Sequence, residues 1–251
     1  MSIKLIIRAD DLGYSEGVNY GIEKSVKDGI VNNVGLMVNM PATVHGYQLI
    51  SDEDIDLSCH VNFSVGKPIS NPKVIPSLVD QEGNFIKSSI YRKTNEDLVD
   101  YEEARIEVFA QLKKFIEITG HKPDYFEGHA ITSQNFVRAI RDIAQENNLI
   151  FIGLTDKDNR IGKYELELIM ESMETDYNPY SVFERIINNS DDSRVKVFIL
   201  HPGYLDEDIL TSSSLLRPRP LEVDFAISDE TKKLIKNKQV DLIKFSDLVR
   251  D

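Results

Sequence analysis

Residues 3–13 read Ile-Lys-Leu-Ile-Ile-Arg-Ala-Asp-Asp-Leu-Gly, an apolar run that ends in two adjacent carboxylates and a glycine. A run of this kind followed by polar residues and glycine predicts a buried strand that leads into a loop. After the loop, apolar residues recur at every fourth position, which is the spacing of one helix face. This spacing predicts a helix that begins at Ser15 or Glu16 and stops at Gly29.

The same alternation of strands and helices continues along the chain. Further strands are expected at residues 34–40, 56–62, 125–127, 150–154, 195–200 and 240–243. Further helices are expected at residues 95–119, 134–147, 164–173, 180–187 and 230–237, followed by one more short helix. Because alternating strands and helices build parallel sheets, the pattern predicts an α/β fold, either a (β/α) barrel or a doubly wound sheet.

The spacing of these elements also indicates the domain organisation. Residues 63–93 contain several prolines and glycines and form a long connection after the third expected strand. Connections of this length are more often functional than incidental. A chain of 251 residues has the usual length of one α/β barrel, and no shift in composition marks a linker. We therefore expect a single domain over residues 1–251 with a long insertion after the third strand.

Composition restricts the partners and the cellular location. Lys and Arg number 29 and Asp and Glu 42, so the formal net charge is −13. A surface this acidic repels phosphate backbones and anionic lipid, so nucleic acid and membranes are not expected partners, whereas a homodimer stays open. Arg8 and Asp10 interrupt the first apolar run too early for a signal peptide, which makes a cytoplasmic location the expectation. Cys59 is the single cysteine, which excludes a disulfide framework and a thiolate zinc cluster.

Polar residues follow the carboxyl ends of several expected strands. Asp10 and Asp11 follow the first strand, and His60 lies near the end of the third. His129 ends the next strand, and His201 follows a later one. In parallel α/β folds the carboxyl ends of the strands converge on one face, where chemistry is placed. We therefore expect these five side chains to meet.

This set of side chains is typical of a metal centre. Adjacent carboxylates repel each other unless a cation or a proton lies between them. One carboxylate and two imidazoles suit zinc or another divalent ion with open positions for water and substrate, whereas Mg²⁺ prefers more oxygen ligands. His201, fixed between a buried strand and Pro202-Gly203, suits proton transfer near neutral pH. The alternatives are an Asx turn or a helix cap for Asp10 and Asp11, and buried core roles for the histidines.

Four stretches of the sequence carry a resemblance to a known family. They are Arg-Ala-Asp-Asp-Leu-Gly-Tyr-Ser (8–15), His-Val-Asn-Phe-Ser-Val-Gly-Lys-Pro-Ile (60–69), Phe-Glu-Gly-His (126–129) and His-Pro-Gly-Tyr (201–204). In this order they resemble the YdjC-like carbohydrate deacetylases, which include the chitooligosaccharide deacetylases. The resemblance implies a TIM-barrel-like fold, complete or distorted, and a metal-dependent hydrolase that removes acetyl groups from N-acetylated sugars or oligosaccharides.

The resemblance also implies roles for the five polar residues. Asp11, His60 and His129 match the family's ligands of one divalent metal ion, Mg²⁺ or Zn²⁺. Asp10 matches the carboxylate proposed as general base, and His201 matches the histidine that acts as acid.

The expected sugar contacts come from aromatic and polar residues near these stretches. The chain has no tryptophan, so tyrosine or phenylalanine must stack on the sugar. Residues 82–85 resemble a Gly-x-Phe element in the family's insertion, which is expected to cover the site. Core packing is the alternative for the phenylalanines, and capping of the following helix is the alternative for the arginine. The candidate substrate-binding residues are Tyr14, Asn62, Lys67, Phe85, Tyr204 and Arg219.

One stretch departs from the family pattern. Family members usually carry two more histidines after the one that matches His129, at alternate positions. Here Ile131 and Ser133 replace them. The replacement predicts a different sugar or a retuned metal site.

Two other functions fit part of the pattern. A metal-dependent phosphoesterase on a barrel scaffold uses similar ligands, but it usually needs a denser set for two or three ions and basic residues for phosphate. A non-catalytic sugar-binding relative is favoured by the changes at Ile131 and Ser133. The intact Asp10 and His201 argue against it, because a pure binder needs neither a placed base nor a placed acid.

Overall fold

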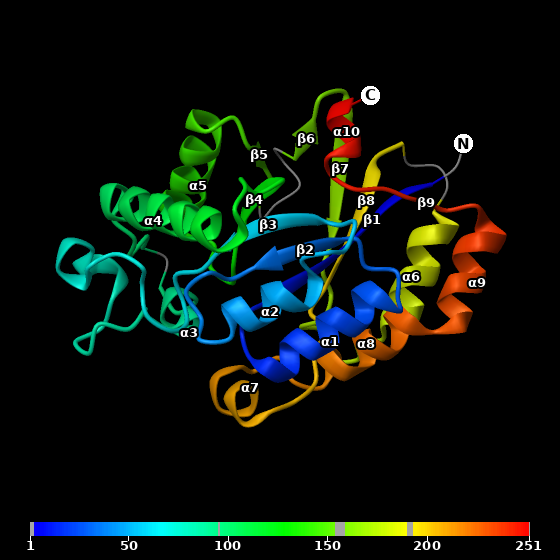
Figure 1. Ribbon diagram of the computed structural model, residues 1–251, viewed down its shortest axis with the longest axis horizontal. Helices are drawn as coiled ribbons and strands as arrows, with labels where there is room; N and C mark the ends of the chain where they lie inside the picture. The colour runs from blue at the N-terminus through cyan, green and yellow to red at the C-terminus, as the bar shows by residue number, and fades with distance from the viewer. Residues whose placement is uncertain (1–2, 95, 154–158, 190–192, 251) are drawn as a thin grey trace.

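The computed structural model describes residues 3–94, 96–153, 159–189 and 193–250. In this part of the chain the strands form one nine-stranded sheet (Figure 1). The strands are β1 (Lys4–Leu12), β2 (Asn33–Leu36), β3 (Asp56–Val61), β4 (Tyr125–Gly128), β5 (Ile150–Phe151), β6 (Arg160–Ile161), β7 (Tyr164–Ile169), β8 (Val195–Leu200) and β9 (Asp241–Leu242). Their order is β5-β4-β3-β2-β1-β8-β7-β6, and β9 pairs with β1 beside this path.

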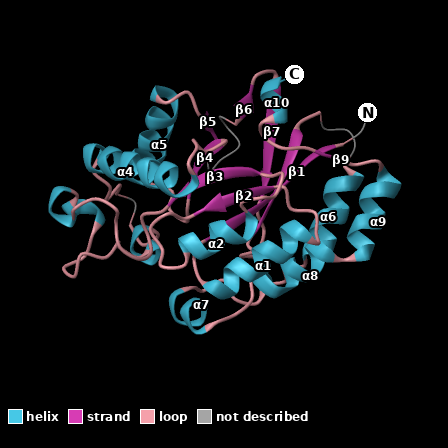
Figure 2. Ribbon diagram, in the orientation of Figure 1, coloured by secondary structure: helices cyan, strands magenta, loops and turns pink. Residues whose placement is uncertain are grey.

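The sheet curls into a nearly closed barrel with helices around it. All strand pairs are parallel except the short β6–β7 pair. Figure 2 shows the helices outside the strands. The helices are α1 (Glu16–Lys27), α2 (Thr43–Ile50), α3 (Ser88–Tyr91), α4 (Tyr101–Thr119), α5 (Gln134–Glu146), α6 (Pro179–Asn188), α7 (Glu207–Ser212), α8 (Pro218–Ile227), α9 (Asp229–Lys238) and α10 (Asp247–Arg250). This architecture confirms the expected α/β fold in the form of a distorted TIM-like barrel.

Alternation along β1 separates two apolar clusters. Leu5 and Ile7 pack in the cluster between the sheet and the helices. Ile6 points to the opposite side and packs in the cluster that fills the barrel interior. Because side chains alternate along a strand, Arg8 and Asp10 continue on the inner side, nearer the carboxyl end. Strand β1 therefore places Arg8 and Asp10 inside the barrel, near the carboxyl ends of the strands.

The C-terminal segment fills the other end of the barrel. Strand β9 pairs with the beginning of β1, and the Phe245 ring packs on Tyr125 at a centroid distance of 4.5 Å. Leu248 of α10 joins the same interior cluster, and Figure 1 shows α10 next to β6 and β7. The amino-terminal end of the barrel is closed by this segment, which leaves the carboxyl end for a cleft.

One predicted element differs in type from the observed one. The prediction of a helix at residues 164–173 is wrong, because residues 164–169 form strand β7. Leu166 and Leu168 point into the barrel interior, and the intervening Glu167 forms an ion pair with Lys196 of β8. This period of two is that of a strand, and pairing with β8 outweighs the helix propensity of Glu and Leu. Positions 95 and 154, which the predictions included, lie outside the described residues.

The predicted insertion after the third strand is confirmed, and it is fastened to α4. It contains α3 and two short 3₁₀ helices at Pro72–Val74 and Pro76–Leu78. The buried carboxylate of Glu107 accepts the backbone N–H groups of Ile69 and Ser70 at 2.9 and 2.8 Å. These bonds hold the insertion against α4. Among the described helices, none combines the length and apolarity needed to span a bilayer.

Candidate active site

A β-bulge in β1 directs two neighbouring carboxylates into one cleft. The register of β1 against β2 shifts between Ala9 and Leu12, so Asp10 and Asp11 share one partner position. Asp11 adopts a left-handed backbone conformation with φ of 77°. Adjacent strand residues normally point to opposite faces, and the bulge removes this alternation. Both carboxylates therefore line the same cleft at the carboxyl end of the barrel.

Gly35 on β2 makes room for this arrangement. A Cβ atom at position 35 would lie 3.1 Å from Glu127 Oε1, 3.2 Å from His60 Cβ and 3.3 Å from Asp10 Oδ1. These contacts are tighter than ordinary van der Waals separations. The missing side chain thus permits the close approach of His60, Asp10 and Glu127.

Three donor atoms form a compact triangle in the cleft. Asp11 Oδ1 lies 3.4 Å from His60 Nε2 and 3.1 Å from His129 Nδ1, and the two nitrogens lie 3.0 Å apart. Asp11 Oδ1 is buried and makes no hydrogen bond within the described ranges. Bonds of about 2.1 Å to a divalent ion place donor atoms about 3.0–3.4 Å apart, in octahedral or tetrahedral geometry. The triangle and the unpaired oxygen therefore fit a divalent ion bound on one face.

A buried glutamate orients one of the imidazoles. Glu127 Oε1 and Oε2 lie 2.6 and 2.7 Å from His60 Nδ1, and the Ser58 hydroxyl donates to Oε1 at 2.9 Å. Although burial opposes protonation of His60, the charges of Glu127 and Asp10 raise its pKa. Burial opposes ionisation of Glu127, but His60 and Arg8 lower its pKa. A carboxylate on Nδ1 places hydrogen there and leaves Nε2 free to bind a metal.

Each aspartate is held by its own buried arginine. Arg8 Nη2 donates to Asp10 Oδ2 and Arg219 Nη2 donates to Asp11 Oδ2, both at 2.7 Å. Arg219 is also fixed by a bond from Nε to the carbonyl oxygen of Leu215. Although burial opposes ionisation of Asp11, the charges of His129 and Arg219 hold its pKa well below the usual range. The second oxygen of each aspartate, Oδ1, is buried and without a hydrogen bond in the part of the chain described.

His201 lies in the same cleft and is fixed at two points. Its Nδ1 is 3.2 Å from the Ser172 hydroxyl, and its backbone N–H donates to Glu222 Oε2 at 2.5 Å. Glu222 also accepts the Tyr177 hydroxyl at 2.7 Å. Burial lowers the pKa of His201 to about 4 and raises the pKa of Glu222 to about 8. The contact with Ser172 leaves Nε2 of His201 for the cleft.

The structure brings most of the predicted site residues together. The cleft has a volume of about 1170 Å³. Arg219 is buried and bonds Asp11 and the carbonyl oxygens of Leu215 and His201, so it holds the site together from within. The predicted residues that line the cleft are Asp10, Asp11, Tyr14, His60, Phe85, His129, His201 and Arg219.

Three predicted substrate contacts lie outside the lining of this cleft. Asn62 is buried, and its amide donates to Asn39 Oδ1 and to the carbonyl oxygen of Val65, so it shapes the adjoining loop. Lys67 is exposed in that loop. Tyr204 is 43% exposed. Asn62 is therefore inaccessible to a substrate, and contacts to Lys67 and Tyr204 require a substrate that extends beyond the cleft.

Arg8 and Glu127 were missed by reasoning from the sequence. Each lies two residues before a predicted site residue, Arg8 within β1 and Glu127 next to the end of β4, so the period of two was a usable signal. Glu127 is also the register partner of His60 across β3 and β4. The two positions that differ from the family pattern have structural roles, since Ile131 is buried in the cleft wall and Ser133 accepts the Phe136 N–H at the start of α5.

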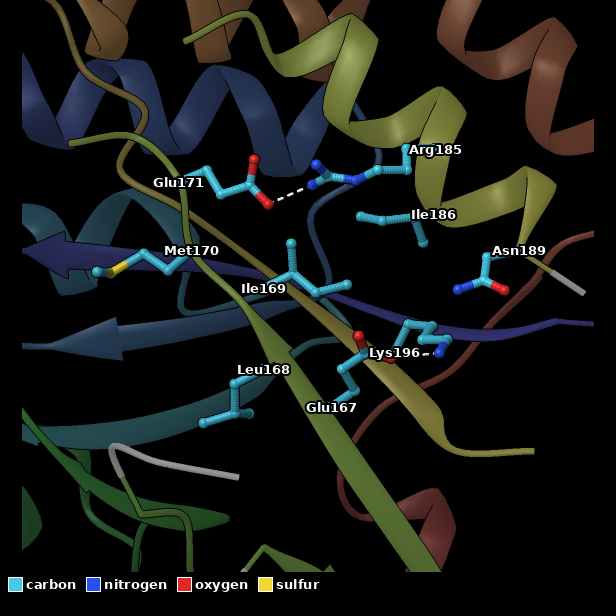
Figure 3. Close-up of a pocket in the computed structure, with 9 residues that line it drawn as sticks. All are labelled: Glu167, Leu168, Ile169, Met170, Glu171, Arg185, Ile186, Asn189 and Lys196. Carbon is cyan, nitrogen blue, oxygen red and sulfur yellow. Dashed lines mark hydrogen bonds and ion pairs between the residues drawn. The ribbon is translucent and has the colours of Figure 1, made fainter. Parts of the chain in front are cut away.

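A second cavity lies between β7, β8 and α6 and has a volume of about 310 Å³. Figure 3 shows its lining, which includes the ion pairs Glu167–Lys196 and Glu171–Arg185. None of its described lining residues is a predicted site residue. The candidate chemistry therefore belongs to the larger cleft.

The fold and the site define the class of protein, a (β/α)-barrel protein with a carboxylate–histidine cluster at the carboxyl ends of its strands. The sequence matches the family described as YdjC-like protein over residues 4–237, so the chain belongs to the YdjC-like family. A carbohydrate deacetylase from Clostridium beijerinckii is 32% identical over 256 residues, which cover 98% of this chain and 100% of that protein. The family assignment that the four motifs predicted is confirmed.

Solved structures of other proteins share the fold, among them the following two. A protein from Enterococcus faecalis V583, provisionally described as a cellobiose-phosphate cleavage protein, has a TM-score of 0.85 at 23% identity over 99% of both chains. A family 4 acetyl xylan esterase from Clostridium thermocellum, solved with a cobalt ion, has a TM-score of 0.53 at 11% identity over 98% of this chain and 90% of the esterase. At these sequence identities, the two comparisons show a shared fold and nothing further.

Proposed function

We propose that this protein is a metal-dependent carbohydrate deacetylase, which hydrolyses the acetamide group of N-acetylated sugars or oligosaccharides. The observation that carries the proposal is the triangle of Asp11 Oδ1, His60 Nε2 and His129 Nδ1, with edges of 3.0 to 3.4 Å. The carbohydrate deacetylase from Clostridium beijerinckii, similar over its whole length, supports the substrate class. One carboxylate and two imidazoles suit Zn²⁺ better than Mg²⁺, and the cobalt ion in the esterase of the same fold supports a divalent ion.

The residues of the cleft suit acetamide hydrolysis. A divalent ion held by the triangle would polarise the acetamide carbonyl and acidify a water molecule. Asp10 is the proposed general base, because its Oδ1 is buried, unpaired and free to accept a proton while Arg8 holds Oδ2. The guanidinium of Arg219, on the far oxygen of Asp11, keeps that carboxylate ionised for metal binding.

His201 is the proposed acid that protonates the leaving nitrogen, since an amine leaves far more easily than an amide anion. Its contact with Ser172 directs Nε2 toward the cleft. Burial lowers its pKa to about 4, so the ring is neutral near pH 7 in the free protein. The acid role therefore requires that His201 takes up a proton with substrate bound, and the resulting imidazolium is a strong acid.

The cleft has room for more than one sugar unit. Its walls combine aromatic side chains, Tyr14 and Phe85, with the hydroxyl-rich segment 211–214. Sugars need such flat apolar surfaces with polar groups at the edges. We infer that Tyr14 and Phe85 contact the substrate and that residues 1–251 act as one deacetylase domain in the cytoplasm.

One observation favours a second candidate, a phosphoesterase or a deacetylase of phosphorylated sugars. Lys87 and Arg92 of the insertion line the cleft, where a phosphate group would bind them. The E. faecalis protein of the same fold is described by cellobiose-phosphate cleavage. Phosphate binding alone does not supply a phosphoesterase, which usually places two ions on a denser ligand set.

The decisive experiment measures the released product. Purified protein is incubated with N-acetylated chitooligosaccharides or with sugar phosphates, with and without a chelator, and acetate and phosphate are quantified. We expect acetate release that a chelator abolishes and that added divalent ion restores. Phosphate release instead would favour the phosphoesterase, and no release of either product, with sugar still bound, would favour a non-catalytic binder. Asp10→Asn serves as the inactive control.

A further inference from the structure

A second set of donors lies beside the metal triangle. The donor atoms of Asp10, His60 and Glu127 lie within 4.8 Å of one another, and all three residues are buried. Asp10 Oδ1 is without a hydrogen bond among the residues described. Two-ion hydrolase sites place their ions about 3.5–4 Å apart and share ligands between them. Because Nδ1 of His60 bonds Glu127 and Nε2 belongs to the first triangle, the donors left for a second ion are the carboxylates of Asp10 and Glu127.

The Arg8 side chain already lies next to these donor atoms. Arg8 Nη2 is 2.7 Å from Asp10 Oδ2 and 3.8 Å from Glu127 Oε2, and the Arg8 side chain is 5% exposed. A guanidinium keeps its proton in proteins, so this positive charge is permanent. Arg8 follows Ile6 on the inner side of β1, and the alternation of the strand fixes it in this place.

The charges of the cluster fit one ion and disfavour two. Asp10, Asp11 and Glu127 supply three negative charges, and Arg8 and Arg219 supply two positive ones. With neutral histidines, the net charge of these groups is one negative unit, and one divalent ion would change it to one positive unit. A second ion would leave a large positive excess in a buried site, which is strongly unfavourable. Without Arg8, the negative charges of Asp10 and Glu127 would be uncompensated, and a second ion could bind between them.

We propose that Arg8 occupies the place of a second divalent ion and thereby limits this site to one. The inference rests on the proposed metal centre at Asp11, His60 and His129. Arg8 acts here as a positioning residue and a fixed counter-charge, through Asp10 and Glu127. Its charge would offset the carboxylates of Asp10 and Glu127 in place of a second ion.

The number of bound ions tests the inference. The full chain and its Arg8→Ala and Arg8→Lys variants are equilibrated with Zn²⁺ or Mn²⁺, dialysed and analysed by elemental mass spectrometry and calorimetric titration. We expect one ion per chain in the wild type and in Arg8→Lys, and a second, weaker ion in Arg8→Ala. The double variant Arg8→Ala/Glu127→Gln should return to one ion. Arg219→Met is the matched control, because it removes a buried arginine without opening the second donor set, so it should bind no more than one ion.

The outcomes separate this inference from the proposed function. One ion in a folded Arg8→Ala variant, or two ions in the wild type, would overturn the role of Arg8. Arg8→Gln replaces Arg8→Ala if the latter does not fold. A wild type that binds no ion would overturn both the metal centre and this inference. A wild type that binds one ion but releases no acetate would contradict only the deacetylase activity, while the ion counts still decide the role of Arg8.

Discussion

Glu127 holds His60 through both carboxylate oxygens, at 2.6 and 2.7 Å from Nδ1. Because an ionised carboxylate only accepts hydrogen bonds, the hydrogen lies on Nδ1, and Nε2 faces Asp11 Oδ1 at 3.4 Å. Both side chains are almost inaccessible to solvent. The carboxylate therefore fixes the orientation of the imidazole before any ion arrives.

Replacing Glu127 by glutamine should weaken ion binding by about 10–100-fold, because carboxylate partners of ligating histidines contribute this much to affinity. Affinity is measured by calorimetry or by competition with a metal-binding dye. Ser58→Ala is the matched control, since it removes the hydroxyl 2.9 Å from Glu127 Oε1 and keeps the carboxylate. Ser58→Ala should lose less ion affinity than Glu127→Gln. Equal affinities in Glu127→Gln and the wild type would contradict the orienting role.

A pair of substitutions separates ion binding from catalysis. Asp10→Asn should keep the ion and lower kcat by about 10²–10⁴-fold, the usual contribution of a general base. His129→Ala removes a donor of the triangle and should lose the ion. Metal content and acetate release are measured on the same preparations. Loss of the ion in both variants, or full activity in either one, would show that the roles of Asp10 and His129 are assigned incorrectly.

Glu222 makes stability depend on pH. Burial raises its pKa to about 8, whereas an unfolded glutamate titrates near ~4.3. The folded protein thus binds this proton more tightly, and its stabilising effect is complete below about pH 4.3 and is lost as the pH rises through 8. In the wild type, this decrease in the free energy of unfolding is on the order of a few kcal/mol. Glu222→Gln cannot ionise and should not show it.

Urea unfolding of the wild type and Glu222→Gln at about pH 5, 6.5 and 8 measures the difference. As the pH rises, the free energy of unfolding of Glu222→Gln should increase steadily relative to that of the wild type. Other titrating groups cancel in this comparison, because both proteins carry them. Parallel stability curves would mean that Glu222 is already ionised in the folded protein.

Much of the fold could be predicted from local pattern. The apolar run that begins β1 and the helical period that follows it are visible in the sequence, and parallel strands end at one edge of a sheet. This reasoning brings Asp10, Asp11, His60 and His201 to one face, as the structure does. The residues of β7 could not be assigned in this way, because their strand geometry depends on pairing with β8, which lies far along the chain.

The details of the site depend on contacts that no single stretch of sequence contains. Two adjacent aspartates reach one cleft only because Asp11 adopts φ of 77° opposite a glycine on the neighbouring strand. Glu127 meets His60 only through the register of β3 with β4. Arg8 was visible two residues before Asp10, but its role follows from the buried distances. The sequence pattern therefore predicted which residues assemble, and the strand register determines how they interact.

The insertion should control substrate affinity through its attachment to α4. The buried Glu107 accepts the N–H groups of Ile69 and Ser70 at 2.9 and 2.8 Å, and the same insertion supplies Phe85 to the cleft wall. Glu107→Ala removes the acceptor of both N–H groups and of the Gln111 side-chain amide, and so releases this wall. We expect a several-fold higher KM for an N-acetylated oligosaccharide with unchanged ion content, because Glu107 does not line the cleft. Glu103→Ala, which removes one such bond, is the control and should change KM less. An unaltered KM in Glu107→Ala, or loss of its ion, would contradict a role of the insertion in holding the substrate.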